Sequence, residues 1–130
     1  MTTPDPALPL GAFSISLAVK DLSRSLAFYE VLGFRPIAGA AAAKWLILRN
    51  GTTTIGLFQD HLPSNTLTFN PGWDGANPPL ADSVDVRELQ RRFRAAGITP
   101  TLAADEATTG PAHCIVVDPD GNPILFDQHV

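Results

Sequence analysis

Two stretches of the chain alternate between apolar residues and small or polar residues. Residues 13–19 (FSISLAV) have an apolar side chain at every second position, and residues 66–70 (TLTFN) repeat this pattern. A period of two is typical of a β-strand that buries one of its faces. The pattern therefore predicts two strands, each with one face of hydroxyl and amide side chains. These side chains are Ser14, Ser16, Thr66, Thr68 and Asn70.

A helix is predicted directly after each of these strands. Residues 19–36 (VKDLSRSLAFYEVLGFRP) and 83–100 (SVDVRELQRRFRAAGITP) each contain an Asp, a Gly twelve residues later and a Pro three residues after that. The Asp residues, Asp21 and Asp85, can cap the free amide groups at a helix start. The glycines favour the left-handed conformation that ends a helix, and the prolines prevent its continuation. Because both copies share these signals at equal spacing, the sequence predicts an internal duplication.

Each half of the chain then continues into further strands. The dipeptides Asn50-Gly51 and Asp120-Gly121 are strong hairpin signals, and apolar runs surround both of them. Short strands at residues 34–38 and 98–102 complete each half as a βαβββ module. The predicted fold class is therefore α+β, with two βαβββ modules forming a cup-shaped mixed sheet. The helices would pack on the apolar faces of the strands, which leaves the small polar faces to line the cup.

The predicted domain organisation is a single domain over residues 1–130. It consists of an N-terminal tail (1–10), a first module (11–62) and a second module (63–130), with a long loop at residues 70–83 before the second helix. The loop contains Trp73. We consider three roles for this side chain: a flap over the mouth of the cup, a dimer contact, or packing on its own domain.

Composition and charge narrow the classes of partner. The chain has 45% hydrophobic and 17% charged residues and a net charge of -4, which is typical of a soluble globular protein and does not favour nucleic-acid binding. No apolar run approaches the ~20 residues that a membrane span needs. A single cysteine, Cys114, excludes an internal disulfide and fits a reducing compartment. We therefore expect a cytoplasmic protein with no nucleic-acid or membrane partner.

Two motifs together with the paired modules resemble a known family. The segments AVKDLSRSLAFYEVLGF, at residues 18–34, and DPDGNPILF, at residues 118–126, are similar to the vicinal oxygen chelate superfamily. This superfamily includes glyoxalase I, bleomycin-resistance proteins, fosfomycin-resistance enzymes and extradiol dioxygenases. The resemblance implies a cup-shaped mixed sheet, a homodimer and a small-molecule ligand held in the cup.

The resemblance also implies where a metal site would lie. Catalytic members of the superfamily bind a divalent cation through a side chain on the first strand of each half and a Glu on the last strand. The corresponding positions are Ser14, Thr66 and Leu125. Hydroxyl groups are poor ligands for divalent transition metals, and a Leu side chain cannot bind them at all. We therefore predict that the metal site is absent and that the protein uses no cofactor.

Asp127 is the remaining candidate for chemistry. It lies two residues beyond Leu125, so it points to the same side of its strand, which is the cup side if the family alignment holds. A carboxylate there could orient a ligand or act as a general acid or base, whereas the simpler interpretation is a solvated residue at a strand end.

The predicted function is metal-independent binding of a small, largely neutral organic molecule in the cup. One alternative is a glyoxalase-related lyase or isomerase, which would use Asp127 as an acid or base or recruit a divalent metal through non-standard ligands. A structural or interaction module with a filled cup is a third interpretation. The predicted substrate-binding residues are Ser14, Ser16, Phe58, Thr66, Thr68, Asn70, Trp73 and Leu125.

Overall fold

The computed structural model describes residues 8–72 and 83–130. Within this part, the elements in chain order are β1 (Ala12–Val19), α1 (Leu22–Val31), β2 (Arg35–Ala40), the 3-10 helix η1 (Ala41–Ala43), β3 (Trp45–Asn50), β4 (Thr53–Gln59), β5 (Thr66–Asn70), α2 (Val86–Ala95), β6 (Ala112–Val117) and β7 (Pro123–Gln128). Trp73 and most of the predicted 70–83 loop lie outside the described residues.

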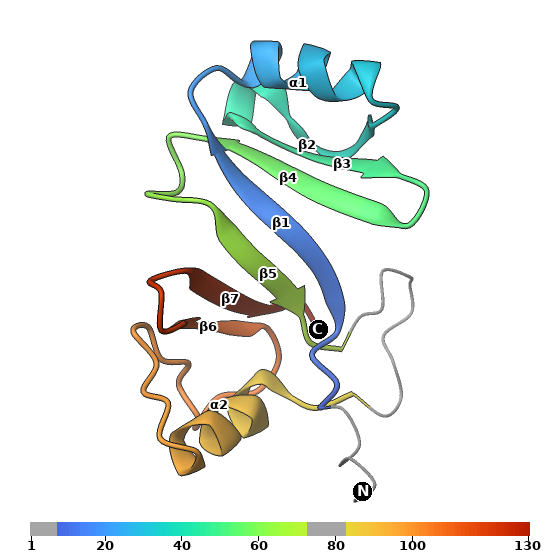
Figure 1. Cartoon of the computed structure of the whole chain (residues 1–130). Helices are drawn as coiled ribbons and strands as arrows, with labels where there is room; N and C mark the ends of the chain where they lie inside the picture. Colours follow the sequence, from blue (N-terminus) through green and yellow to red (C-terminus); the bar gives the residue numbers. More distant parts are fainter. Residues whose placement is uncertain (1–7, 73–82) are drawn as a thin grey trace, which may run out of the picture.

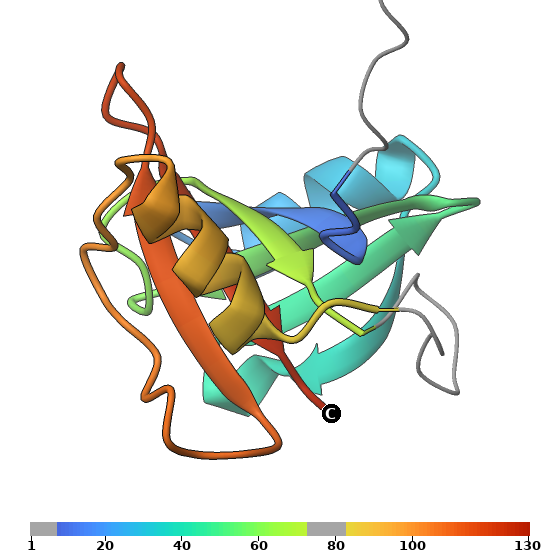
Figure 2. The same ribbon diagram turned by 90° about the horizontal axis from the view of Figure 1, so that it is seen from below.

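The strands form one mixed sheet in the order β2-β3-β4-β1-β5-β7-β6. Within each half the first strand runs parallel to a later one, β1 beside β4 and β5 beside β7, and the antiparallel pair β1–β5 joins the halves. The sheet curls, with α1 beside one half and α2 beside the other (Figures 1 and 2). This arrangement confirms the predicted α+β fold class.

Both helices begin and end at the predicted signals. The Asp21 carboxylate accepts a hydrogen bond from the Arg24 amide at 3.1 Å, and the Asp85 carboxylate accepts one from the Arg87 amide at 2.8 Å. Gly33 and Gly97 follow the helices with positive φ angles of 97° and 88°. Because a positive φ costs a residue with a Cβ atom free energy, glycine suits both helix ends.

The second half differs from the prediction after its helix. Residues 98–102 form only an isolated bridge between Leu102 and Ile115, where a short strand was expected. Pro100 has no amide hydrogen to donate to a neighbouring strand. Two residues after Leu102, the backbone of Ala104 bonds to the Gln90 side chain, which both accepts from the Ala104 amide at 2.7 Å and donates to the Ala104 carbonyl at 3.0 Å. The Gln90 side chain thus makes the two hydrogen bonds that a neighbouring strand would otherwise make with Ala104.

A hydrophobic core lies under each helix. The first contains Leu48 and Leu57 and is completed by Ile15 and Leu17 from β1, and the second contains Leu89 and Phe126. Because neighbouring residues of a strand point to opposite faces, the remaining side chains of these strands point away from the helices. We call this second sheet face the open face. Its side chains come from β3 (45, 47, 49), β4 (54, 56, 58), β1 (14, 16), β5 (66, 68, 70), β7 (125, 127) and β6 (113, 115).

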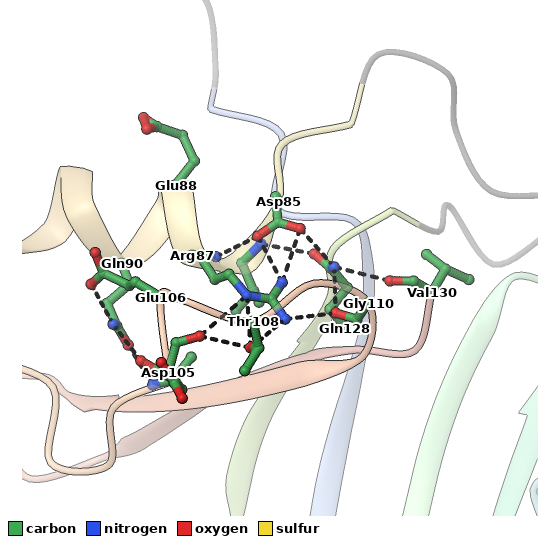
Figure 3. Close-up of polar contacts among 12 residues, drawn as sticks. Asp85, Arg87, Glu88, Gln90, Asp105, Glu106, Thr108, Gly110, Gln128 and Val130 are labelled. Carbon is green, nitrogen blue, oxygen red and sulfur yellow. Dashed lines mark hydrogen bonds and ion pairs between the residues drawn. The ribbon is translucent and has the colours of Figure 1, made fainter.

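A buried polar network connects the start of α2 to the end of β7 (Figure 3). The Arg87 guanidinium donates to the Asp85 carboxylate at 3.1 Å, and to the Thr108 hydroxyl and the Gly110 carbonyl at 3.0 Å. The Gln128 amide group donates to the same carboxylate at 2.9 Å, and its oxygen accepts from the Val86 amide at 2.8 Å. Loop residues 105–110 and the last strand are thereby fixed to the helix N-terminus.

Candidate functional site

Hydroxyl groups occupy the middle of the open face, on the two strands that join the halves. Ser16, Thr66 and Thr68 are all buried. The Ser16 and Thr68 hydroxyl oxygens lie 2.7 Å apart, and the Thr66 hydroxyl donates to the Ser64 carbonyl at 3.1 Å. These hydroxyls are therefore satisfied within the protein. The Ser14 side chain, by contrast, makes no hydrogen bond to another residue of the described part of the chain.

The metal positions implied by the family resemblance do not offer metal ligands. Ser14 pairs with Thr68, and Thr68 pairs with Leu125, so these three residues form one row across β1, β5 and β7. Thr66 lies opposite Ser16, one row further along. In residues 8–72 and 83–130, no three His, Cys, Asp or Glu side chains lie close enough to hold a metal ion together. Two hydroxyls and a Leu do not fit a divalent transition metal.

Aromatic side chains form the part of the open face on β3 and β4. The Trp45 and Phe58 rings are nearly parallel, with 8° between their planes and 6.2 Å between their centroids. A Cβ atom on Gly56 would approach the Phe58 ring to 2.6 Å, so the absence of a side chain at Gly56 allows this ring to pack over β4. Phe58 also meets the His61 ring edge-on at 6.3 Å. We call Trp45 and Phe58 the aromatic pair.

Sequence reasoning placed Phe58 on this face but missed its neighbours Trp45, Ile47 and Arg49. The alternation of residues along the first strand of the hairpin indicates the position of these three side chains. Leu46 and Leu48 are buried on the helix side of β3, so strict alternation places residues 45, 47 and 49 on the open face.

Arg49 places a second kind of charge on the open face, besides the Asp127 carboxylate. It lies opposite Thr54 in the β3–β4 register, and its Nε donates to the Thr54 hydroxyl at 3.2 Å. Arg35 is its partner on the other side, in the β2–β3 register. Arg35 donates through Nη1 to two backbone carbonyls, those of Glu30 at 3.0 Å and Phe34 at 2.7 Å. Neither arginine forms an ion pair within the described residues.

Asp127 lies at one corner of the open face. It pairs with His113 across β6–β7, and its carboxylate lies 3.3 Å from Nε2 of His129. The registers place it level with Ala12 on β1, whereas Phe58 is level with Ala18. At 3.3 Å per residue this separates the two side chains by roughly 20 Å along the strands, in addition to three strand spacings. One small molecule cannot contact both of them.

Another predicted binding residue, Asn70, has its side chain bonded to the protein backbone. Asn70 is on the open face, but its side-chain amide donates back to the Ala12 carbonyl at 3.3 Å.

A recess of about 470 Å³ lies away from the aromatic pair, between the end of α2 and the β6–β7 turn, and includes Ile98, Val117 and Ile124. None of the predicted binding residues in the described part of the chain lines this recess.

Cys114 is buried in the second core, and this burial raises the pKa of its thiol to about 11. A thiol with this pKa is almost fully protonated at neutral pH, and only the thiolate is a nucleophile. Its position therefore gives it a packing role.

The chain matches a family model described as Glyoxalase/Bleomycin resistance protein/Dioxygenase superfamily over residues 11–126. No curated protein matches the sequence. None of the helices in the described part of the chain is long and apolar enough to cross a membrane.

Solved structures with the same fold include proteins with different descriptions. A glyoxalase/bleomycin resistance protein/dioxygenase superfamily member from Vibrio splendidus 12B01 is 18% identical, with a TM-score of 0.62, and the match covers 89% of this chain and 97% of that one. A protein described as an NAD-dependent benzaldehyde dehydrogenase from Legionella pneumophila is 16% identical, with a TM-score of 0.64 and coverages of 91% and 99%. A 2,2',3-trihydroxybiphenyl 1,2-dioxygenase from Sphingomonas wittichii strain RW1 is 14% identical, with a TM-score of 0.50 and coverages of 92% and 40%. At these identities the likeness shows the fold alone.

Proposed function

Because the chain belongs to the glyoxalase/bleomycin resistance protein/dioxygenase superfamily, we propose that it binds a small organic molecule on the open face without a metal ion. The superfamily name covers resistance proteins as well as enzymes, so membership does not choose between binding and catalysis. The choice rests on the side chains of the open face. The observation that carries the proposal is the aromatic pair, on the same sheet face whose metal positions hold hydroxyl and Leu side chains.

The aromatic pair supplies the apolar contact area that a small ligand needs. Large, flat side chains dominate the energetics of binding sites because each can bury a large area with little loss of side-chain freedom. Ile47 extends this surface along β3, and Gly56 leaves room for the Phe58 ring. We infer that the body of the ligand is apolar and uncharged.

Metal independence follows from the chemistry of the donor atoms. Ser14 and Thr66 offer neutral hydroxyls, and the Thr66 hydroxyl already donates to the Ser64 carbonyl. Leu125 has no donor atom. A reaction that requires a divalent cation at these positions would lack its ligands, whereas binding requires none.

One observation favours a lyase or isomerase as a second candidate. The Asp127 carboxylate and the His129 ring form a close acid–base pair, and His113 lies opposite in the register. Asp127 and His129 are far from the aromatic pair, so such an enzyme would bind its substrate at a different corner of the open face. Asp127→Asn would abolish its turnover, while a binding protein of the first kind would keep its affinity.

We also propose that the protein acts as a homodimer. Phe28, Val31 and Leu32 lie at the outer side and end of α1 and are all exposed. Residues three and four apart on a helix are neighbours, so these side chains form one apolar surface. Apolar patches of this kind mark interaction sites in soluble proteins.

Calorimetric titration of chelator-treated protein with 2-naphthamide, a flat neutral probe, tests the proposed function. We expect binding that Phe58→Ala weakens about tenfold or more, because the variant removes half of the aromatic pair. Phe13→Ala is the matched control, since Phe13 is exposed and lies on the opposite face of the sheet. Equal affinities for the two variants, or binding that requires an added divalent metal, would contradict the proposal.

A further inference from the structure

We propose that the ligand of the open face carries a carboxylate group and that Arg49 binds it. This inference rests on the proposed function and specifies the chemical class of the ligand: a flat apolar body with one anionic end. The aromatic pair would contact the body, and the guanidinium of Arg49 would receive the carboxylate.

The first observation is that Arg49 is incompletely paired. Its Nε donates to the Thr54 hydroxyl, a neutral acceptor, at 3.2 Å. Its two terminal amino groups have no hydrogen-bond or ion-pair partner among the residues that the structure describes. The side chain is nevertheless partly buried against the sheet. A charged group removed from water without a compensating charge costs free energy, and an anionic ligand would recover it.

The second observation is the neighbour of Arg49 on the edge strand. Arg35 lies directly opposite it in the β2–β3 register. Like charges placed opposite each other on adjacent strands destabilise a sheet. Arg35 uses Nη1 to bond to carbonyls at the end of α1, and it forms no ion pair with a carboxylate of the described residues. An anion bound near Arg49 would reduce the repulsion between the two arginines.

The third observation is that most other cations of the chain do find a carboxylate. In the described residues, ion pairs with Asp or Glu are formed by Lys44, Arg87, Arg91, Arg92 and Arg94. The chain has 13 acidic residues and a net charge of -4, so acidic partners are not scarce. Two further cations without such a partner in this part of the chain, Lys20 and Arg24, are exposed next to or on α1. Arg49 is partly buried and faces the open side of the sheet.

The position of Arg49 relative to the aromatic pair defines the shape of the ligand. Trp45 and Arg49 lie four residues apart on β3 and point to the same face, with Ile47 between them. Their backbone positions are therefore roughly 13 Å apart, a span that the long Arg side chain can shorten considerably. A guanidinium also binds the two oxygens of a planar carboxylate at once, which favours this group over a spherical anion.

The test compares two probes that differ mainly in charge, 2-naphthoate and 2-naphthamide, by calorimetric titration at low salt. For the unmodified protein we expect 2-naphthoate to bind about tenfold more tightly. Arg49→Gln should abolish this preference by weakening the binding of 2-naphthoate much more than that of 2-naphthamide, and Arg49→Lys should retain part of the preference. Arg24→Gln removes the same charge from an exposed helix position and should keep the preference, which separates direct contact from the effect of net charge.

The outcomes distinguish this inference from the proposed function. If both probes bind equally well to the unmodified protein, the open face binds apolar molecules but Arg49 is not an anion site, and the inference is overturned. A preference for 2-naphthoate that persists in Arg49→Gln would overturn it as well, because another group would then hold the carboxylate. If neither probe binds, the proposed function fails and the inference fails with it. Thermal unfolding of each variant verifies that it is folded.

Discussion

Replacing Arg87 by Met is predicted to destabilise the protein strongly, although Arg87 lies outside the open face. Its side chain is only 5% exposed, and its guanidinium donates to Asp85, Thr108, Gly110 and the Asp105 carbonyl. Met has a similar length and fills the same space. The substitution therefore removes the charge and the hydrogen bonds while it creates little cavity.

The magnitude follows from the groups that lose their partner. Removing one partner of a fully buried ion pair typically costs 3–5 kcal/mol. The Asp85 side chain is 45% exposed, so water replaces part of the lost interaction, and the cost falls toward the lower end of this range. Two carbonyls and the Thr108 hydroxyl lose a donor in addition. We expect about 3 kcal/mol, which corresponds to a decrease in Tm of about 10 °C for a domain of this size.

Chemical and thermal unfolding measure this effect, and Arg92→Met is the matched control. Arg92 is 53% exposed and pairs with Glu88 four residues earlier on the same helix, so its loss should cost no more than about 0.5 kcal/mol. If Arg87→Met were destabilised by less than 1 kcal/mol, or no more than Arg92→Met, the buried network would not stabilise the second half as described.

The pH dependence gives a second readout of the same network. Burial alone would raise the pKa of Asp85, but hydrogen bonds from Gln128 and Arg87 outweigh it and hold the pKa below its usual value of 3.8. A carboxyl group whose pKa is depressed by folding contributes stability above its unfolded-state pKa and loses it as the pH falls through the folded-state pKa. The difference between the unmodified protein and Arg87→Met should therefore be constant near neutral pH and narrow below about pH 4.

Three further predictions concern other parts of the molecule. Incubation with a chelator should leave the Tm of the purified protein unchanged; a decrease of several degrees would contradict metal independence. Cys114 should react with a thiol reagent at pH 8 only as fast as the protein unfolds, because its pKa is raised to about 11, and rapid labelling of folded protein would refute this. Val31→Glu should shift the protein toward monomer in light-scattering measurements without loss of stability, since Val31 is 86% exposed, whereas an unchanged mass would remove the outer face of α1 from the proposed interface.

The sequence predicted the elements whose signals are local. The caps at Asp21 and Asp85 and the helix ends at Gly33 and Gly97 are set by neighbouring residues, and the structure places all four as expected. The strand expected at residues 98–102 was wrong: only Leu102 bridges to Ile115, because Pro100 has no amide hydrogen on one side and the Gln90 side chain holds the backbone of Ala104 on the other. Such a replacement depends on tertiary contacts that no local pattern reveals.

The candidate site was harder to predict because it depends on the register of strands that are distant in sequence. Alternation alone places Phe58 and Asp127 on one face, but only the pairings of β1 with β4 and of β5 with β7 show that they lie at opposite corners. Register also shows that Thr68, and not Thr66, stands between Ser14 and Leu125. The Asn50-Gly51 signal predicts only the turn of the hairpin, whereas the position of Arg49 on the open face depends on the alternation along β3.

The most direct test of metal-independent binding on the open face is a map of backbone amide chemical shifts during titration of chelator-treated protein with 2-naphthoate. We predict that the largest changes occur in β3 and β4, around the aromatic pair and Arg49, with smaller changes at Ser14 on β1 and little change in α2. Changes confined to the recess that includes Ile98 and Ile124, or a titration that responds only after a divalent metal is added, would contradict the proposed site.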